Sequence, residues 1–359
     1  MKVKFELATS ISNSFAVQKV GGMFDVDVPG IAVSNFSVEL PDSKEKWKIG
    51  AIVGPSGSGK SSVAKHAYGN AVSPNPHWPH EPVIDVVGKC DIKDRCEMLT
   101  RVGFSSPPAW IKPYQVLSTG EKFRADMARL LCSDRKLIVV DEFTSVVDRQ
   151  VAQFGSAAIA KAVRKTDRQF IAVSCHYDIL EWLQPDWILD MGVTRADGHA
   201  GELSRRKLRR PDIKIDIRKC KRATWRLFAK HHYLTASLPG GYYFAACIGE
   251  RPIAFCAVAA MFGKPDCRRL SRTVVLPDFQ GIGIGSRLSD TIAAMVAADG
   301  KRCYATTGHP AMVAYRRTSP NWRTKKVYKH GRKRSGISAE KRGLDTRTAR
   351  ARVGFEWVG

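Results

Sequence analysis

The sequence predicts two domains, an α/β domain with a buried parallel sheet followed by an α+β domain. Its 359 residues are about twice the usual length of one domain. Before residue 192, short β-branched runs alternate with helical stretches, and after residue 212 several strands come in succession before one long helix. The segment 192–212 is rich in Gly and Arg. We therefore place a boundary near residue 206, giving domains of 1–205 and 206–359.

The strands of the first domain are expected at 49–53, 137–140 and 170–173, because these runs are almost wholly apolar, as in strands buried on both faces. Helices are expected between them at 60–66, 121–131 and 150–164. In the second domain we expect strands at 242–248, 253–261, 272–276 and 302–306. A helix is expected at about 284–298, and another begins near residue 310.

Composition and the lack of a signal segment favour a cytoplasmic protein, which for a viral protein means the host cytoplasm. Hydrophobic residues make up 44% and charged residues 26%, as in folded soluble proteins. The longest apolar stretch, 252–263, is far shorter than the roughly 18 to 20 residues that span a bilayer. The first residues lack the apolar core of a secretory signal. Nine cysteines without a Cys-x-x-Cys pair are expected to be reduced thiols.

The net charge of +24 is unevenly distributed. Residues 1–200 hold 24 Lys and Arg against 23 Asp and Glu, whereas residues 201–359 hold 34 against 11. A basic C-terminal segment, 323–352, contributes 12 basic and two acidic residues. Such a field favours a polyanionic partner, and nucleic acid is the commonest one; a surface that merely keeps the protein in solution is the alternative.

The run 54–61 fits the phosphate-loop (P-loop) pattern G-x-x-x-x-G-K-[ST], directly after an expected strand and before an expected helix. Glycines in such a loop let successive backbone N–H groups turn toward phosphates. Lys60 would reach the β- and γ-phosphate oxygens, and the Ser61 hydroxyl would ligate Mg²⁺. The residues expected to bind ATP here are Gly54, Pro55, Ser56, Gly57, Ser58, Gly59, Lys60, Ser61 and Ser62.

The apolar strand at 137–140 ends in two acids, Asp141 and Glu142. Two adjacent carboxylates after a buried strand are seldom a packing solution, because both need compensation. We expect Asp141 to hold Mg²⁺ with Ser61, and Glu142 to orient or deprotonate the attacking water.

Three further motifs follow the order found in the ABC-type ATPases, which this half of the chain resembles. Residues 117–121 (LSTGE) are similar to that family's LSGGQ signature, with Ser118 and Gly120 at the nucleotide-contacting positions. Residues 145–148 resemble its D-loop, and His176 resembles its switch histidine. The resemblance implies ATP hydrolysis with Mg²⁺ and an ATP-dependent homodimer, in which one chain's signature completes the other's site.

Two departures from the family argue against a membrane transporter. Only about a dozen residues separate an expected strand end at 102–105 from the signature, too few for the helical subdomain that grips membrane partners in that family. The family's Q-loop glutamine is also not evident, since Ser105 or Ser106 stands near its place.

A second glycine-rich turn, in 272–285, joins a strand to a helix in the basic half. The spacing is wrong for the dinucleotide pattern G-x-G-x-x-G, which is the alternative interpretation. The turn resembles the pyrophosphate loop [QR]-x-x-G-x-[GA] of the GNAT acyltransferases, on Gln280, Gly281, Gly283 and Gly285. The resemblance implies binding of acyl-coenzyme A, with acetyl-coenzyme A favoured. Tyr315 is the candidate for protonating the departing thiolate.

Within that superfamily, short motifs resemble the phage Mom-type DNA-modification proteins, which modify adenine in viral DNA and blunt restriction. They are 231–233 (HHY), 270–272 (LSR) and 355–357 (FEW). The two histidines could alternatively ligate metal, although adjacent side chains point in different directions, so a substrate or structural role is favoured. Trp225, Tyr233 and Trp322 are candidates for stacking on an exposed base, with a core position as the alternative.

These observations predict an ATP-hydrolysing, acyl-coenzyme A-using enzyme that modifies a nucleic-acid base, with DNA favoured over RNA. Two other functions stay open. One is a non-catalytic, ATP-controlled regulator that binds nucleic acid, and the other is a tRNA acetyltransferase.

Overall fold

A computed structural model describes residues 1–73, 76–232, 237–328 and 352–359. The chain divides into two compact units. The first contains residues 1–76, 134–146 and 163–210, and the second contains 77–133, 147–162 and 211–359. The second unit thus combines two stretches of the first predicted domain with the chain after residue 210. The domain limits of 1–205 and 206–359 stay a prediction.

The first unit is built on a six-stranded sheet in the order β4-β5-β6-β3-β7-β8. The first five strands in this order are parallel, and β8 is antiparallel to β7. The strands span Ile49–Val53 (β3), Val72–Ser73 (β4), Leu137–Val140 (β5), Gln169–Ser174 (β6), Trp187–Thr194 (β7) and Ala200–Ser204 (β8). All five residues of β3 are buried, as the apolar sequence predicts for a central parallel strand.

Helices of the first unit connect these strands. α2 (Lys60–Tyr68) follows β3 directly, as predicted for the P-loop, and continues into the 3-10 turn η1 (Gly69–Ala71). After β6 come η3 (Tyr177–Ile179) and α8 (Leu180–Leu183). Val63 and Ala64 of α2 are fully buried and pack with Ile52 in the core of this unit.

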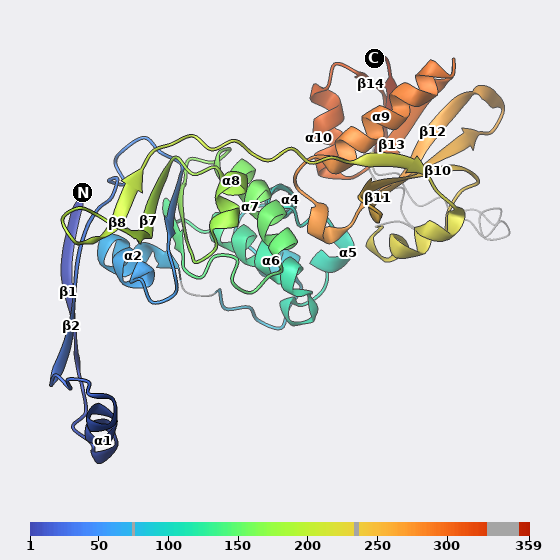
Figure 1. Cartoon of the computed structure of the whole chain (residues 1–359). Helices are drawn as coiled ribbons and strands as arrows, with labels where there is room; N and C mark the ends of the chain where they lie inside the picture. The colour runs from blue at the N-terminus through green and yellow to red at the C-terminus, as the bar shows by residue number, and fades with distance from the viewer. Residues whose placement is uncertain (74–75, 233–236, 329–351) are drawn as a thin grey trace. The chain divides into compact units, whose positions relative to one another are not determined.

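An N-terminal hairpin extends from the first unit (Figure 1). Its antiparallel strands, β1 (Lys2–Ser10) and β2 (Ile31–Glu39), pair along their whole length, and α1 (Phe15–Phe24) lies at their far end. Inward and outward residues alternate only in part, so much of the ribbon faces solvent on both sides.

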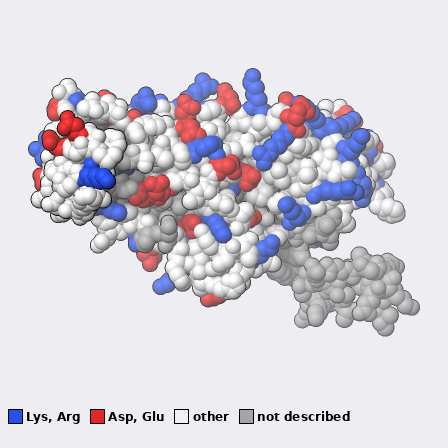
Figure 2. Space-filling model, turned by 60° about the horizontal axis from the view of Figure 1, so that its bottom comes forward, with Lys and Arg blue, Asp and Glu red and all other residues white. Residues whose placement is uncertain are grey.

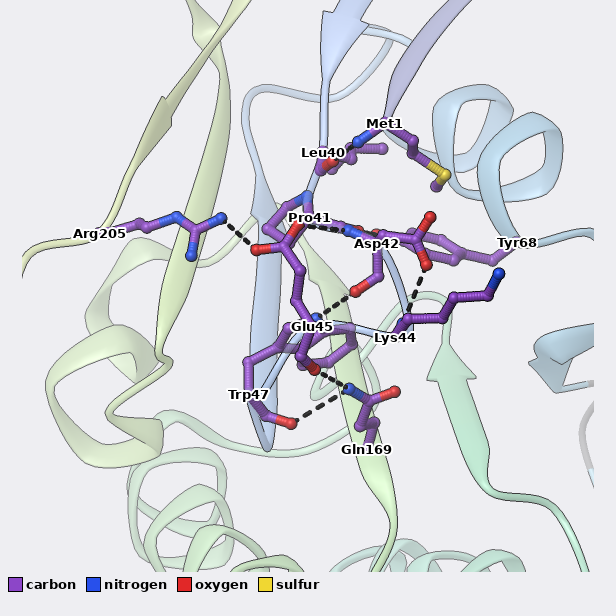
Figure 3. Close-up of polar contacts among 10 residues, drawn as sticks. All are labelled: Met1, Leu40, Pro41, Asp42, Lys44, Glu45, Trp47, Tyr68, Gln169 and Arg205. Atoms are coloured by element: carbon purple, nitrogen blue, oxygen red, sulfur yellow. Dashed lines mark hydrogen bonds and ion pairs between the residues drawn. The ribbon is translucent and has the colours of Figure 1, made fainter.

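The base of the hairpin is held by polar contacts of the 41–47 connection (Figure 3). The Trp47 indole donates to the carbonyl of Asp42 at 2.9 Å, and Gln169 of β6 donates to the carbonyls of Glu45 and Trp47 at 3.1 and 3.2 Å. Arg205, after β8, donates to the Glu45 carboxylate at 2.7 Å and thereby lowers its pKa. These contacts fix where the hairpin leaves the sheet.

In the second unit, several helices precede its sheet in the chain. They are α3 (Val83–Val86), α4 (Ile92–Arg101), α5 (Pro107–Trp110), η2 (Tyr114–Val116), α6 (Thr119–Leu131) and most of α7 (Arg149–Val163). The expected strand end at 102–105 is wrong: α4 ends there in a turn in which Gly103 has φ +86°. The charged sequence of α4 buries Leu99 and Thr100 and leaves its polar residues outside, which is a helical pattern.

The second unit also contains a seven-stranded sheet, in the order β14-β15-β13-β12-β11-β10-β9. Neighbours are antiparallel except for β12 and β13, which are parallel. The strands span Asp216–Lys219 (β9), Gly241–Ile248 (β10), Arg251–Met261 (β11), Lys264–Val275 (β12), Arg302–Thr307 (β13), Trp322–Tyr328 (β14) and Arg352–Trp357 (β15). The start of the basic segment is therefore a strand, and its residues 329–351 lie outside the described ones.

Short 3-10 turns, η4 (Arg222–Leu227) and η5 (Ala229–His231), precede β10, and η6 (Pro277–Phe279) follows β12. α9 (Ile284–Ala298) connects the parallel pair β12 and β13 and contacts both strands. α10 (Pro310–Thr318) begins at a proline, which suits the first helical position. Ile292 and Ala293 of α9 are fully buried. The α9 and α10 helices thus lie where the sequence predicts them.

Candidate functional site

The P-loop lies between β3 and α2, and its glycines have the backbone geometry that the motif requires. Gly57 and Gly59 have φ of +79° and +86°, which favour glycine. Lys60 is buried, and its ammonium donates to the carbonyl of Pro55 at 2.6 Å, inside the loop. The Ser58 hydroxyl is buried without a hydrogen-bond partner among the described residues. A positive group and an unsatisfied hydroxyl in one loop fit an anionic ligand such as a phosphate.

The two predicted metal ligands lie together. The Ser61 hydroxyl donates to the Asp141 carboxylate at 3.1 Å. A hydroxyl and a carboxylate oxygen are the hard donors that Mg²⁺ prefers, and the remaining positions are usually taken by water and phosphate oxygens. The residues fit Mg²⁺ bound with a nucleotide. Within the described ranges there is no group of three or more His, Cys, Asp or Glu, so a metal site made by protein ligands alone is not found there.

Glu142 follows Asp141 in a strained turn. Both Glu142 and Thr144 have positive φ, 52° and 70°, which is uncommon for residues other than glycine and is frequent at functional sites. The exposed Glu142 carboxylate accepts a hydrogen bond from Ser145. His176 lies at the end of β6, with its Nδ1 3.5 Å from the Thr144 hydroxyl. The structure therefore groups Glu142 and His176 near the end of β5, although their roles stay predictions.

A hollow of about 630 Å³ opens beside Asp141. It is lined by Lys65, Gly69, Asn70, Val72, Ser73, Arg135 and Asp141. The metal candidates are therefore reachable from solvent.

The signature residues open α6 with a capping box. Ser118 is the N-cap: its hydroxyl accepts from the Glu121 amide at 3.4 Å, while the Glu121 carboxylate accepts from the Ser118 amide at 3.0 Å. Glu121, which stands where the family has Gln, therefore stabilises the helix start. Ser118 is exposed, so its side chain can be reached from solvent, and its contact with a nucleotide stays a prediction. Asp148 caps α7 in a similar way, through the amides of Gln150 and Val151, both at 3.0 Å.

In the glycine-rich turn before α9, Gln280 makes structural hydrogen bonds and Gly283 forms the helix start. The Gln280 side chain is buried and bonded, accepting from the Ser105 amide at 2.7 Å and donating to the Val275 carbonyl at 2.8 Å. Gly283 is the N-cap of α9 with φ +95°, and a Cβ added there would meet nothing within 4 Å. Gly283 thus faces open space at a helix start that has no side-chain cap, as an anion site requires, whereas Gly281 is closely packed.

The parallel strands β12 and β13, beside this turn, pair over only part of their length. β12 pairs with β13 only over 267–270 and 302–305, although β12 continues to Val275 and β13 to Thr307. Arg272, just beyond the paired part, has φ +54°. β13 does not pair with β12 over residues 271–275, where the Val275 carbonyl accepts a hydrogen bond from Gln280 instead.

Tyr315 lies on α10 and donates its hydroxyl to Asp290 of α9. Burial, and then the bond to Asp290, raise the pKa of Tyr315. Asp290 also accepts from the indole of Trp322 at 2.8 Å. A raised pKa makes Tyr315 a weaker acid in this arrangement, so its role as proton donor stays a prediction.

The other aromatic and histidine candidates are mostly in the core. Trp225 and Trp322 are only 6% and 5% exposed, so they take the core position that was the alternative to stacking on a base. His232 is buried beside Trp225, and burial, with the charge of Arg272, lowers its pKa to about 4. Its surroundings favour a structural role. Tyr233 lies outside the described residues.

Two residues near these sites were not singled out from the sequence. The ring of Phe36 lies against the P-loop, because a Cβ on Gly59 would fall 2.3 Å from it. Arg124 of α6 is completely buried. Phe36 stands in an alternating strand and Arg124 in a helix rich in basic residues, so neither has a spacing signal that marks a site.

Comparison with protein families finds one match, in the second half of the chain. Residues 210–318 match the family described as "Acetyltransferase (GNAT) family". The chain carries a GNAT domain. The matched range includes the turn 280–285 and Tyr315, whose roles stay predictions. No curated protein matches the chain.

Solved structures with some similarity are ABC proteins. A bacterial Atm1-family ABC exporter with ATP bound is 17% identical, with a TM-score of 0.34, over 48% of this chain and 35% of the exporter, so the chain spans about a third of that protein. The protein cbiO1 of Clostridium perfringens, part of the ABC transporter complex cbiONQ, is 18% identical, with a TM-score of 0.36, over 44% and 77%. A dimeric ATP-binding cassette in a post-hydrolysis state with ADP and Pi is 15% identical, with a TM-score of 0.37, over 50% and 92%.

The predicted α/β and α+β classes are confirmed. An α/β part with a P-loop sequence and a largely parallel sheet precedes an α+β part that matches the GNAT family over residues 210–318, while the ABC-type assignment stays a prediction. Among the described helices, none is both long enough and apolar enough to cross a membrane.

Proposed function

We propose that this protein hydrolyses ATP in its ABC-type domain and uses acyl-coenzyme A in its GNAT domain to modify a base of nucleic acid. The observation that carries the proposal is the presence of two separate glycine-rich turns in one chain, each leading into a helix with a left-handed glycine at its N-cap. One holds the Ser61–Asp141 pair beside a P-loop, and the other lies within the GNAT match.

In the ATPase site, backbone amides of 54–62 and Lys60 bind the phosphates, and Ser61 with Asp141 holds Mg²⁺. The cation, when bound, neutralises charge on the phosphates. Glu142 accepts the proton of the attacking water or orients it, and His176 contacts the γ-phosphate region from the end of β6. Ser118 and Gly120 of a second chain complete the site, so ATP favours a homodimer and hydrolysis releases it.

In the GNAT site, the amides at the start of α9 bind the pyrophosphate of acyl-coenzyme A, and its amide arm lies along β12 beyond the part that pairs with β13. An exocyclic amine of a base attacks the thioester carbonyl. The new N–C bond forms as the C–S bond breaks, the amine loses its proton to solvent, and Tyr315 returns a proton to the departing thiolate. Acetyl-coenzyme A is the favoured donor.

The charge of the second half supports a nucleic-acid substrate. On the face shown in Figure 2, blue side chains outnumber red ones over the GNAT part at the right. Exposed basic residues of β12, α9, α10 and β14 include Lys264, Arg269, Arg287, Arg317, Arg323 and Lys326. A base in a duplex must be flipped out, or be single-stranded already, before its amine can reach a thioester. We favour DNA over RNA, in line with the Mom-type resemblance, which the family match leaves untested.

Acyl transfer from a thioester needs no ATP, so we assign the ATPase to clamping or remodelling the polymer. The two alternative functions, the regulator and the tRNA acetyltransferase, can be distinguished from the proposed one by which nucleic acid is acylated. A non-catalytic regulator would bind nucleic acid under ATP control without any acyl transfer, and a tRNA acetyltransferase would modify tRNA and leave DNA unchanged.

Mass spectrometry of nucleosides tests the proposal. DNA and tRNA are digested from cells that express the wild type or Gly283→Glu, a change that places a carboxylate where the pyrophosphate binds. We expect an acylated DNA nucleoside only with the wild type. An acylated nucleoside confined to tRNA would favour the tRNA enzyme, and no new nucleoside in either pool would favour the regulator.

A further inference from the structure

Within the second unit, the acyl-coenzyme A turn is docked on the segment that links α4 to the signature helix. Gln280 bonds the Ser105 amide at 2.7 Å, as described above. His309, the N-cap of α10, contacts the Ser105 carbonyl through its Nε2 at 3.2 Å. Phe279 is buried and packs on Phe154 of α7, with ring centroids 5.2 Å apart. Both elements that carry the predicted acyltransferase residues therefore rest on one short segment.

Two glycines make this contact very close. Gly103 and Gly281 have φ of +86° and +89°. A Cβ on Gly281 would lie 2.8 Å from the Gly103 Cα, and a Cβ on Gly103 would lie 2.8 Å from the Gln280 carbonyl oxygen. These distances exclude any side chain, so the two backbones can move relative to each other only if the contact opens.

Arg124 connects the same turn to the start of α6. Its guanidinium donates through Nη2 to the carbonyl of Asp278 at 2.9 Å, while Nε and Nη1 are buried without a hydrogen-bond partner among the described residues. A Cβ on Gly120 would lie 3.6 Å from Arg124 Nη1 and 3.6 Å from Asp278 Oδ1. The signature glycine, Arg124 and the acyl-coenzyme A turn are thus immediate neighbours.

Arg124 is surrounded by acidic residues of three segments: the glycine-rich turn before α9, the signature-like start of α6 and the D-loop-like segment 145–148. Burial lowers the pKa of Arg124 to about 10, against the opposing charges of Asp278, Glu121 and Asp148. Glu121 belongs to the signature and Asp148 to the D-loop. The energy of a buried cation depends strongly on its distances to these carboxylates, because charges interact strongly in a low dielectric. A small movement of either segment therefore changes the energy of Arg124.

We propose that Arg124 is a positioning residue that ties the acyl-coenzyme A turn to the signature helix, so that ATP engaged by the signature changes the affinity of the GNAT domain for acyl-coenzyme A. This inference rests on the proposed function, in which Ser118 and Gly120 meet ATP. α6 is a single 13-residue helix with a capped start, so a shift of Ser118 carries Arg124 with it. The shift is transmitted to the Asp278 carbonyl, two residues before Gln280.

The two effects must be reciprocal. If ATP changes acyl-coenzyme A affinity by some factor, acyl-coenzyme A changes ATP affinity by the same factor. Typical couplings between sites are about 5- to 150-fold, and we expect about tenfold here.

The test uses isothermal titration of acetyl-coenzyme A into the full-length protein with Glu142→Gln, which holds ATP without turnover, in the presence and absence of Mg-ATP. We expect about a tenfold difference between the two conditions. Adding Arg124→Met, which keeps an unbranched stem but removes the charge and the hydrogen bond to Asp278, is expected to leave each ligand's separate affinity within about threefold and to abolish the difference. Gly103→Ala forces the backbones apart and is expected to abolish it too.

Ser105→Ala is the matched control, because the contact with Gln280 uses the backbone amide, which the substitution keeps. It should retain the full difference. If Arg124→Met fails to fold, Gly103→Ala decides the matter against the same control.

Three results would overturn the inference. Equal acetyl-coenzyme A affinity with and without bound ATP would exclude the coupling while leaving the proposed function in place. A full difference in both Arg124→Met and Gly103→Ala would show that the coupling uses another route. Failure of either ligand to bind the parent protein would remove the coupling together with the half of the proposed function that needs that ligand.

Discussion

Glu142 follows Asp141 and has an exposed carboxylate, and we predict that it accepts the proton of the attacking water. We expect Glu142→Gln to keep ATP affinity and to lower the hydrolysis rate by about 10²- to 10⁴-fold, the usual contribution of a general base. Phosphate release and equilibrium binding of ATP measure the two effects. Ser145→Ala, which removes the hydroxyl that donates to Glu142, should cost far less. An unchanged hydrolysis rate in Glu142→Gln would remove Glu142 from this role.

Glu356 of β15 is the basis of a second prediction, which concerns the pH dependence of the free energy of unfolding. The residue is 4% exposed, and burial alone would raise its pKa, but hydrogen bonds from Arg323, Arg302 and Lys325 outweigh burial and lower the pKa to about 2. In the unfolded chain the carboxyl titrates near its ordinary value of 4.5. The lowered pKa therefore stabilises the fold fully above about pH 4.5, and this contribution is lost as the pH falls toward 2.

We expect Glu356→Gln to lower the free energy of unfolding at pH 7 by about 2 kcal/mol, since charged hydrogen bonds are lost while the basic partners stay solvated. The difference between variant and wild type should shrink as the pH falls from 4.5 to 2. Urea unfolding at several pH values measures it. A difference that does not change with pH would contradict the assignment.

At the scale of elements, the start of α9 allows a direct prediction about binding of acetyl-coenzyme A. Gly283 needs its left-handed φ and faces open space, so Gly283→Glu adds both backbone strain and a carboxylate where an anion is expected. Calorimetry with acetyl-coenzyme A should show binding to the wild type and at least a hundredfold weaker binding to the variant, from charge repulsion and the lost approach of the amides. Gly300→Ala, which changes a left-handed glycine beyond the far end of α9, is the control and should bind normally.

Elements with strong local patterns could be predicted from the sequence. β3 and β5 are short apolar runs bounded by turns, and α9 follows a glycine cap. The hydrophobic pattern and the turn residues were therefore sufficient to predict these three elements. The segment 102–105, by contrast, has only two large apolar residues, Val102 and Phe104, and the strand end predicted there is wrong. In the structure Val102 and Phe104 are both buried by a turn after α4.

Long-range contacts could not be predicted. The sequence places Gln280 in a pyrophosphate pattern, but its side chain bonds the amide of Ser105, 175 residues away. The burial of Arg124 depends on Asp278, which is 154 residues away. Tyr315 was found by its place after β13, while its partner Asp290 depends on how α9 and α10 pack. Single-sequence patterns contain no information on such pairings.

For the whole molecule, the uneven charge predicts how it meets a polyanion. If about six to ten basic side chains of the second half contact phosphates, raising the salt from about 50 to 200 mM should weaken DNA binding by on the order of a thousandfold or more. Removing one contacting Lys or Arg, for example Lys326→Ala, should flatten the slope of log affinity against log salt by about one. Lys65→Ala, on α2 of the first half, should leave the slope unchanged. Fluorescence anisotropy with the full chain measures this, and a flat salt response would contradict a phosphate-binding role for the charge.

The account rests on one chemical claim, that this chain transfers an acyl group from coenzyme A to a base of nucleic acid. The most direct measurement incubates the purified full-length protein with acetyl-coenzyme A labelled in its acetyl group and with single-stranded and duplex DNA, with and without Mg-ATP. After digestion, the account predicts label on a nucleoside, dependent on the protein, absent with Gly283→Glu, and more dependent on ATP with duplex than with single strands. Unlabelled DNA and RNA under conditions in which calorimetry shows acetyl-coenzyme A bound would contradict it.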